Sequence, residues 1–180
     1  MKTVFQALIL LFVPLLMQAQ QATQETPSDH HAGVTARGDE AMGFPHDKTT
    51  HHFRLFNDGG AIEVEANDPK DTASRDNIRM HLEHISRAFA AGNFNIPMFI
   101  HATNPPGAAT MAELRDQIRY QYQETDSGAR IRIRTTNSRA GKAIHDFLRF
   151  QISDHQTGDS LKISEDNGKN DPTPRPEDSR

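Results

Sequence analysis

Two histidines that lie three residues apart could bind a metal ion together. His81 and His84 belong to the stretch MHLEHISRAF, inside a predicted helix over about residues 71–91. Residues at this spacing share one face of a helix, so both imidazoles can reach a single ion. We expect a third ligand from His101 or Met98, because the chain must return past this helix to stay compact. The sequence therefore predicts a transition-metal site at His81, His84 and His101, with Met98 as a further candidate.

Two more histidines are secondary candidates for this site. His52 follows His51 at the start of a predicted strand, where successive side chains point to opposite faces, so only one of the two can join a given site. His155 continues the apolar stripe of the last predicted helix. Histidine and methionine donors without cysteine suit copper, and histidine alone also suits zinc. The expected cofactor is therefore a copper ion, with zinc as the alternative.

The chain contains no cysteine, which excludes several kinds of site. Covalent attachment of haem c, iron–sulfur clusters and cysteine zinc sites all need thiolates. The sequence also lacks GxSxG, HExxH and a phosphate-binding glycine loop. No sequence motif therefore indicates an enzyme.

The same histidines allow two other interpretations. A histidine at the edge of an amphipathic helix often packs its ring and hydrogen-bonds a carbonyl group, and Met80 and Met98 would fit an apolar core. The second interpretation is therefore a metal-free module that docks on a periplasmic protein partner. The third is a hydrolase or lyase, in which a histidine and a carboxylate from elsewhere in the chain provide a general base.

The first residues, MKTVFQALILLFVPLLMQAQ, have the composition of a secretory signal peptide. We expect residues 1–19 to be cleaved and the protein to be periplasmic or secreted. The apolar run is too short to span a bilayer, so no membrane span is expected. The whole chain carries a net charge of −4, which argues against nucleic-acid binding through bulk charge.

Composition divides the rest of the chain into three parts. Residues 20–45 are rich in Gln, Thr, Ser, Pro and Gly and predict a flexible leader. Residues 159–180 are charged, contain several prolines and predict a disordered tail. A single domain is expected between them, at residues 46–158.

Apolar periodicity within this domain predicts two β-hairpins, with turns at residues 57–60 and 126–128. A long amphipathic helix follows each hairpin, over about residues 71–91 and 138–158. Two shorter elements are predicted between the hairpins, a strand at 97–101 and a helix at 110–117. We expect an α+β fold in which the two hairpins form one antiparallel sheet, packed on one face by the two main helices.

Charged residues alternate with apolar ones on both predicted hairpins. Because the exposed face of a sheet is solvated, opposite charges on neighbouring strands can pair across it. We expect such pairing between Arg130, Arg132 and Arg134 on one hairpin and Glu63 and Glu65 on the other.

Four stretches carry a resemblance to a known group of sequences. They are MGFPHDKTTHHFRLFNDGGAIEV, HLEHI, PMFIHATNPPG and AIHDFLRFQISDHQTGD. From Met42 to about Asp159, the chain resembles an uncharacterised family of small, often exported bacterial proteins. The resemblance supports the predicted domain boundaries and implies no activity. Some such sequences carry the label aspartate carbamoyltransferase, but this chain is too short for the two domains of that enzyme and lacks its Ser-Thr-Arg-Thr-Arg loop.

Overall fold

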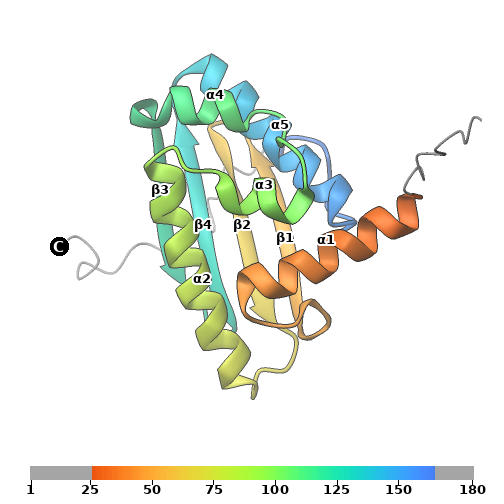
Figure 1. Cartoon of the computed structure of the whole chain (residues 1–180). Coiled ribbons are helices and arrows are strands. Elements are labelled where there is room, and N and C mark those ends of the chain that lie inside the picture. Colours follow the sequence, from red (N-terminus) through yellow and green to blue (C-terminus); the bar gives the residue numbers. More distant parts are fainter. Residues whose placement is uncertain (1–25, 165–180) are drawn as a thin grey trace, which may run out of the picture.

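The computed structural model describes residues 26–164, so the predicted signal peptide and residues 165–180 lie outside the described part. Figure 1 shows the arrangement of its helices and strands. In chain order these are α1 (Pro27–Met42), η1 (His46–Lys48), β1 (Thr49–Phe56), β2 (Gly59–Ala66), α2 (Thr72–Ala90), α3 (Asn95–His101), α4 (Ala108–Glu113), η2 (Arg115–Gln117), β3 (Ile118–Glu124), β4 (Gly128–Thr135) and α5 (Ser138–Asp154).

The four strands form one antiparallel sheet in the order β1-β2-β4-β3. Each predicted hairpin is present, and the two hairpins meet where β2 pairs with β4. Helices α2 and α5 pack on the same face of the sheet, while α3 lies across the gap between them and α1 packs on α3 (Figure 1). The α+β prediction, with one antiparallel sheet covered on one face by two main helices, is confirmed.

The two main helices form where their periodicity predicts them. In α2 the buried stripe contains Ile78, Leu82, Ile85 and Phe89, and the side chain of Asp71 caps the helix by accepting from Ser74 N at 3.0 Å. Helix α5 has the same design, with Asn137 as its N-cap. Its buried residues include Ile144, Phe147, Leu148 and Ile152. The facing stripes of both helices build the core against the inner face of the sheet.

A glycine at the first hairpin turn allows the two hairpins to approach closely. Gly59 has φ +140°, a conformation that side chains rarely adopt. A Cβ atom at this position would lie 2.2 Å from the carbonyl oxygen of Ile133 on β4. Any other residue here would push the two hairpins apart.

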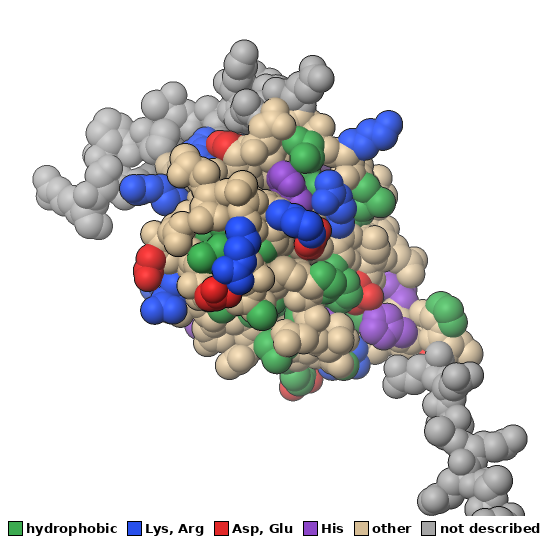
Figure 2. All heavy atoms as spheres, turned by 90° about the horizontal axis from the view of Figure 1, so that it is seen from above, with side chains coloured by type: hydrophobic (Ala, Val, Ile, Leu, Met, Phe, Trp, Pro, Cys, Tyr) green, Lys and Arg blue, Asp and Glu red, His purple; other side chains and the backbone are tan. Residues whose placement is uncertain are grey.

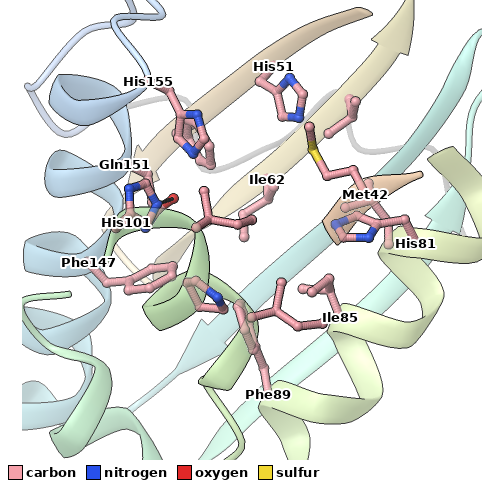
Figure 3. A pocket seen from close by; sticks show the side chains of 16 residues that line it. Met42, His51, Ile62, His81, Ile85, Phe89, His101, Phe147, Gln151 and His155 are labelled. Atoms are coloured by element: carbon pink, nitrogen blue, oxygen red, sulfur yellow. Dashed lines mark hydrogen bonds between the residues drawn. The ribbon is translucent and has the colours of Figure 1, made fainter. Parts of the chain in front are cut away.

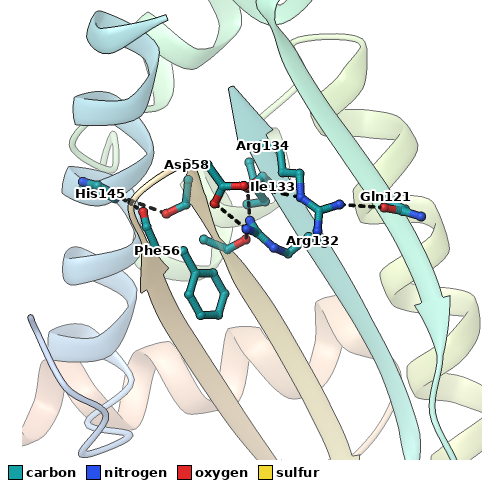
Figure 4. A network of polar contacts seen from close by, with 9 residues as sticks. Phe56, Asp58, Gln121, Arg132, Ile133, Arg134 and His145 are labelled. Atoms are coloured by element: carbon teal, nitrogen blue, oxygen red, sulfur yellow. Dashed lines mark hydrogen bonds and ion pairs between the residues drawn. The ribbon is translucent and has the colours of Figure 1, made fainter. Parts of the chain in front are cut away.

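On the face of the sheet that the helices do not cover, the predicted arginine–glutamate pairing is found only in part. Arg130 pairs with Glu63 at 3.0 Å between Nε and Oε1, across the β2–β4 register. Arg132 and Arg134 instead pair with Asp58, in the turn of the first hairpin (Figure 4). Asp58 lies beside the end of β4, where Arg132 and Arg134 are, and it therefore competes for them with the glutamates of β2.

The prediction of a flexible leader is wrong for the residues that form α1. Thr26 and Asp29 make a capping box, Pro27 occupies the first turn, and Gly43 ends the helix in the left-handed conformation. Apolar periodicity is weak because Val34 is the only large apolar residue of α1 that is buried. Local capping and packing on α3 therefore form a helix that composition does not reveal.

Two further predictions are corrected. Residues 97–101 belong to helix α3 and not to a strand, because a short apolar run alone does not distinguish the two. The predicted disorder is wrong for residues 159–164. Asp159 accepts a hydrogen bond from the backbone N of Phe53 at 2.9 Å, and Ser164 N donates to Leu55 O at 2.8 Å. This segment therefore lies along β1.

The surface seen from above, where α4 lies, carries charges of both signs (Figure 2). Acidic side chains lie beside basic ones, and Glu113 and Arg139 form an ion pair at 2.6 Å between Oε2 and Nη2. None of the helices in the described part of the chain has the length and apolar character needed to cross a membrane.

Candidate functional site

A pocket lies between the inner face of the sheet and the helices that cover it (Figure 3). It contains about 510 Å³ of empty space, part of which is open to solvent. Most of its wall is apolar, and its polar members are histidines and one glutamine. The lining residues are Met42, His51, Phe53, Ile62, Val64, His81, Leu82, Ile85, Phe89, Ile96, Pro97, Ile100, His101, Phe147, Gln151 and His155.

The four pocket histidines come from four different elements. His51 lies on β1, His81 on α2 and His101 at the end of α3, while His155 is the C-cap of α5. Their convergence follows from the layered fold, because the sheet and each of these three helices contribute one side of the same space. Helix α1 adds Met42 from its last turn.

The imidazole rings lie close to one another. The ring centroids of His51 and His155 are 5.9 Å apart, and their planes are within 3° of parallel. The rings of His101 and His155 are 4.8 Å apart and nearly perpendicular, at 81°. In Figure 3, Met42 lies on the side of the pocket where His51 and His81 are, opposite His101 and Gln151. The pocket therefore has an imidazole on each side.

Three of these imidazoles make no hydrogen bond to any residue of the described chain. They belong to His51, His81 and His155, all of which are half-buried. Burial, together with the neighbouring histidines, lowers the pKa of His51 and His81 to about 4 and that of His155 to about 3. All three rings are therefore neutral near pH 7, with a free electron pair on one nitrogen.

His101 differs from these three because a carboxylate orients its ring. Its side chain is 1% exposed, and Nδ1 donates to Oδ2 of Asp154 at 2.5 Å. The same carboxylate accepts from Nε2 of His30 on α1 at 2.9 Å. Burial acts to raise the pKa of Asp154, but hydrogen bonds from His101 and His30 outweigh it and lower this pKa below its usual value. Asp154 therefore stays ionised and fixes the orientation of His101.

Gln151 is the other buried polar residue of the pocket. It is 4% exposed, and its Oε1 atom lies 3.0 Å from Nε2 of His101. Its side-chain Nε2 is buried and has no hydrogen-bond partner among residues 26–164.

The predicted site residues fall into two groups. His81, His101 and His155 line the pocket. His84 and Met98 are exposed and do not line it, and Met98 is 40% exposed on α3. His52 points to the opposite face of β1, where its Nδ1 atom lies 2.9 Å from Oδ1 of Asp159. The structure therefore brings three of the six candidates together.

Sequence reasoning missed His51 and Met42. His51 is two residues before Phe53 and four before Leu55, both of which are buried. Strand alternation therefore places His51, and not His52, on the inner face, and this signal was present in the sequence. Met42 had no comparable signal, because the helix that carries it was not predicted.

The comparisons with known proteins give no family. No family model, no curated protein and no solved structure matches the chain. Its chemistry must therefore be argued from the site itself.

The side chains, as they stand, do not form a complete metal centre. Among residues 26–164, no three or more histidine, aspartate or glutamate side chains are grouped so that they could hold one ion. Pairs of neighbouring imidazoles are present, as in His51 with His155 and His101 with His155. The arrangement offers imidazole nitrogens around a mainly apolar space, and a carboxylate orients one of the rings, that of His101.

Proposed function

We propose that this chain is an exported domain that binds a transition-metal ion, copper foremost, in the histidine pocket, for capture or delivery. The observation that carries the proposal is that His51, His81 and His155 line one pocket without hydrogen-bond partners in the described chain. Histidines that serve packing usually have such partners, as His145 does here, with Nε2 at 2.8 Å from Phe56 O. Neutral imidazoles are the form of histidine that binds metals.

The donor types favour copper. The pocket offers imidazole nitrogens and the thioether of Met42, and the chain has no cysteine. Imidazole suits copper and zinc alike, whereas a thioether favours copper. We propose that the ligands are drawn from His51, His81, His101, His155 and Met42, which replace His84, Met98 and His52 as candidates.

The contact between His101 and Asp154 supports this proposal. A histidine that binds a metal almost always donates its other ring N–H to a carboxylate, a carbonyl group or water. Nδ1 of His101 donates to Asp154, and Nε2 lies on the pocket side, 3.0 Å from Oε1 of Gln151, a contact that a metal ion bound at Nε2 would replace. Asp154 would therefore hold His101 in the tautomer that a metal requires.

Metal titration of the purified mature protein tests the proposal. Cu(I), Cu(II), Zn(II) and Ni(II) would be added separately and followed by native mass spectrometry. We expect one ion per chain in the wild type. The double variant His81→Leu/His155→Leu should bind more than about 100-fold more weakly, because even changes outside the ligand shell cost 10- to 100-fold in metal affinity.

The matched control is His52→Ala/His84→Ala, which removes two histidines outside the pocket. It should bind like the wild type, and circular dichroism would establish that both double variants are folded. A wild type that binds none of the ions contradicts the metal proposal. Equal binding by the pocket variant contradicts the location of the site.

A second candidate function is general acid–base catalysis by His101. The observation that favours it is the buried pair with Asp154, since a carboxylate that orients a histidine is the usual arrangement of a catalytic base. Metal-free wild type should then hydrolyse simple p-nitrophenyl esters, and His101→Gln should lose this activity. Without turnover by the metal-free wild type, the second candidate is rejected.

A further inference from the structure

We infer that the histidine pocket selects a soft monovalent metal ion, Cu(I) or Ag(I), over divalent ions. This inference rests on the proposed metal-binding function and specifies the class of ion. Three features of the pocket carry it: its lack of charge, the thioether of Met42, and the pairing of its imidazoles.

The first feature is the absence of charged side chains from the pocket wall. Among the lining residues in the described part of the chain there is no Asp, Glu, Lys or Arg. The energy needed to bring an ion into a medium of low dielectric constant grows with the square of its charge, so a divalent ion costs about four times as much as a monovalent one. Anionic ligands offset this cost for divalent ions, and the pocket wall provides none, so a monovalent ion is favoured.

One carboxylate, that of Asp154, lies just outside the pocket lining. Asp154 contacts His101 through Oδ2 and His30 through Oδ1. Its single negative charge, transmitted through the His101 ring, can balance one positive charge in the pocket. It cannot balance two, so the local charge favours a monovalent ion.

The second feature is the thioether donor. Met42 lines the pocket from the last turn of α1, on the side of His51 and His81 (Figure 3). Thioether sulfur is a soft donor that selects Cu(I) over harder divalent ions. A methionine that served packing alone would favour no ion.

The third feature is that the imidazoles are grouped in pairs. No group of three or more His, Asp or Glu side chains is set around one point in residues 26–164, whereas the rings of His51 and His155 are stacked with centroids 5.9 Å apart and those of His101 and His155 are 4.8 Å apart. Two imidazoles that bind one ion from opposite sides place their nitrogens about 4 Å apart, since each bond is about 2 Å. To bind in this way, the stacked rings of His51 and His155 must turn about their side-chain bonds until a nitrogen of each points at the ion. Cu(I) and Ag(I) accept such low coordination numbers, while Zn(II) requires four ligands.

Competition between ions tests this inference on the full mature chain. Ag(I), which does not change its oxidation state in air, would be bound first and then challenged with Zn(II) and Cu(II), and anaerobic Cu(I) would be titrated against bicinchoninate. Nuclear magnetic resonance of the histidine Hε1 protons would report the site. We expect shifts at His51 and His155 with Ag(I), and no displacement by a tenfold excess of either divalent ion.

Two methionine variants isolate the thioether. Met42→Leu should weaken Ag(I) binding about tenfold, whereas Met98→Leu, at an exposed position on α3, should leave it unchanged. Equal affinities of the wild type and Met42→Leu overturn the role of the sulfur. Displacement of Ag(I) by Zn(II) or Cu(II) overturns the inference but leaves the proposed function intact. A chain that binds none of these ions overturns both.

Discussion

The two faces of the sheet bury polar side chains in opposite ways. On the face away from the helices, Arg132 is fully buried and its Nη1 atom donates to Gly60 O at 2.9 Å and to Ile133 O at 2.6 Å. Its guanidinium group also pairs with Asp58 and lies 4.6 Å from the centroid of the Phe56 ring (Figure 4). On the inner face, His51, His81 and His155 carry no charge near pH 7 and have no hydrogen bond in the described chain.

This difference separates residues that hold the fold together from residues available to a ligand. A buried group that is paired on several sides fixes its neighbours, and its removal leaves their carbonyl and carboxylate groups without partners. A half-buried imidazole without a partner contributes little to stability, and protonation makes it unfavourable. The arginine network should therefore respond to substitution through stability, and the histidine pocket through binding and pH.

The largest effect is expected at Arg132. Arg132→Ala should lower the free energy of unfolding by about 2–4 kcal/mol, because it removes a fully buried guanidinium group and leaves Asp58 and two carbonyl groups without their donor. Urea unfolding followed by circular dichroism measures this loss. Arg134→Ala is the control, since Arg134 is 40% exposed and should cost at most about 1 kcal/mol. A similar loss in both variants would remove the distinction between the two arginines.

The second effect concerns pH. The pKa values of His51, His81 and His155 are lowered from 6.5 in the unfolded chain to about 4, 4 and 3 in the folded protein, so the unfolded state binds more protons between these limits. The free energy of unfolding should therefore keep its full value above about pH 6.5 and fall as the pH approaches 4. Each histidine contributes up to about 1.4 kcal/mol per pH unit.

His81→Leu tests this assignment, because it removes one titrating ring and keeps an apolar side chain in the pocket. Urea midpoints at pH 7, 6 and 5 should decline less steeply in the variant than in the wild type. His84→Leu, at an exposed position on the same helix, should keep the wild-type slope. Identical slopes in all three proteins would show that the pocket histidines do not govern the pH dependence.

The smallest effect is expected for a histidine outside both regions. His84→Ala should change the free energy of unfolding by less than about 0.5 kcal/mol, since its side chain is exposed. Thermal unfolding of the metal-free protein measures this change. A loss above 1 kcal/mol would mean that the exposed face of α2 also contributes to stability.

Periodicity predicted the parts of the fold in which one face is buried. The alternation of Phe53 and Leu55 gave β1, and the stripe from Ile78 to Phe89 gave α2, because each pattern reports burial directly. Helix α1 has no such pattern. Its formation depends on the Thr26 capping box and on contacts with α3, which is distant in sequence.

The candidate site was predicted in part for the same reason. His81 and His101 were identified from their neighbours on a helix and in an apolar run, and both line the pocket. His84 was paired with His81 by spacing alone, but the helix turns it to solvent. Spacing along one element shows which side chains share a face, whereas a pocket depends on how several elements pack together.

Helix α1 has a practical consequence for anyone who shortens this protein. A fragment that begins at His46, as composition alone would suggest, loses Val34 and Phe44 from the core and the Met42 side of the pocket. It also loses the Arg37 guanidinium, which donates to Ile100 O at 2.7 Å at the end of α3. An affinity tag should therefore be fused upstream of Thr26, where the capped start of the helix stays intact.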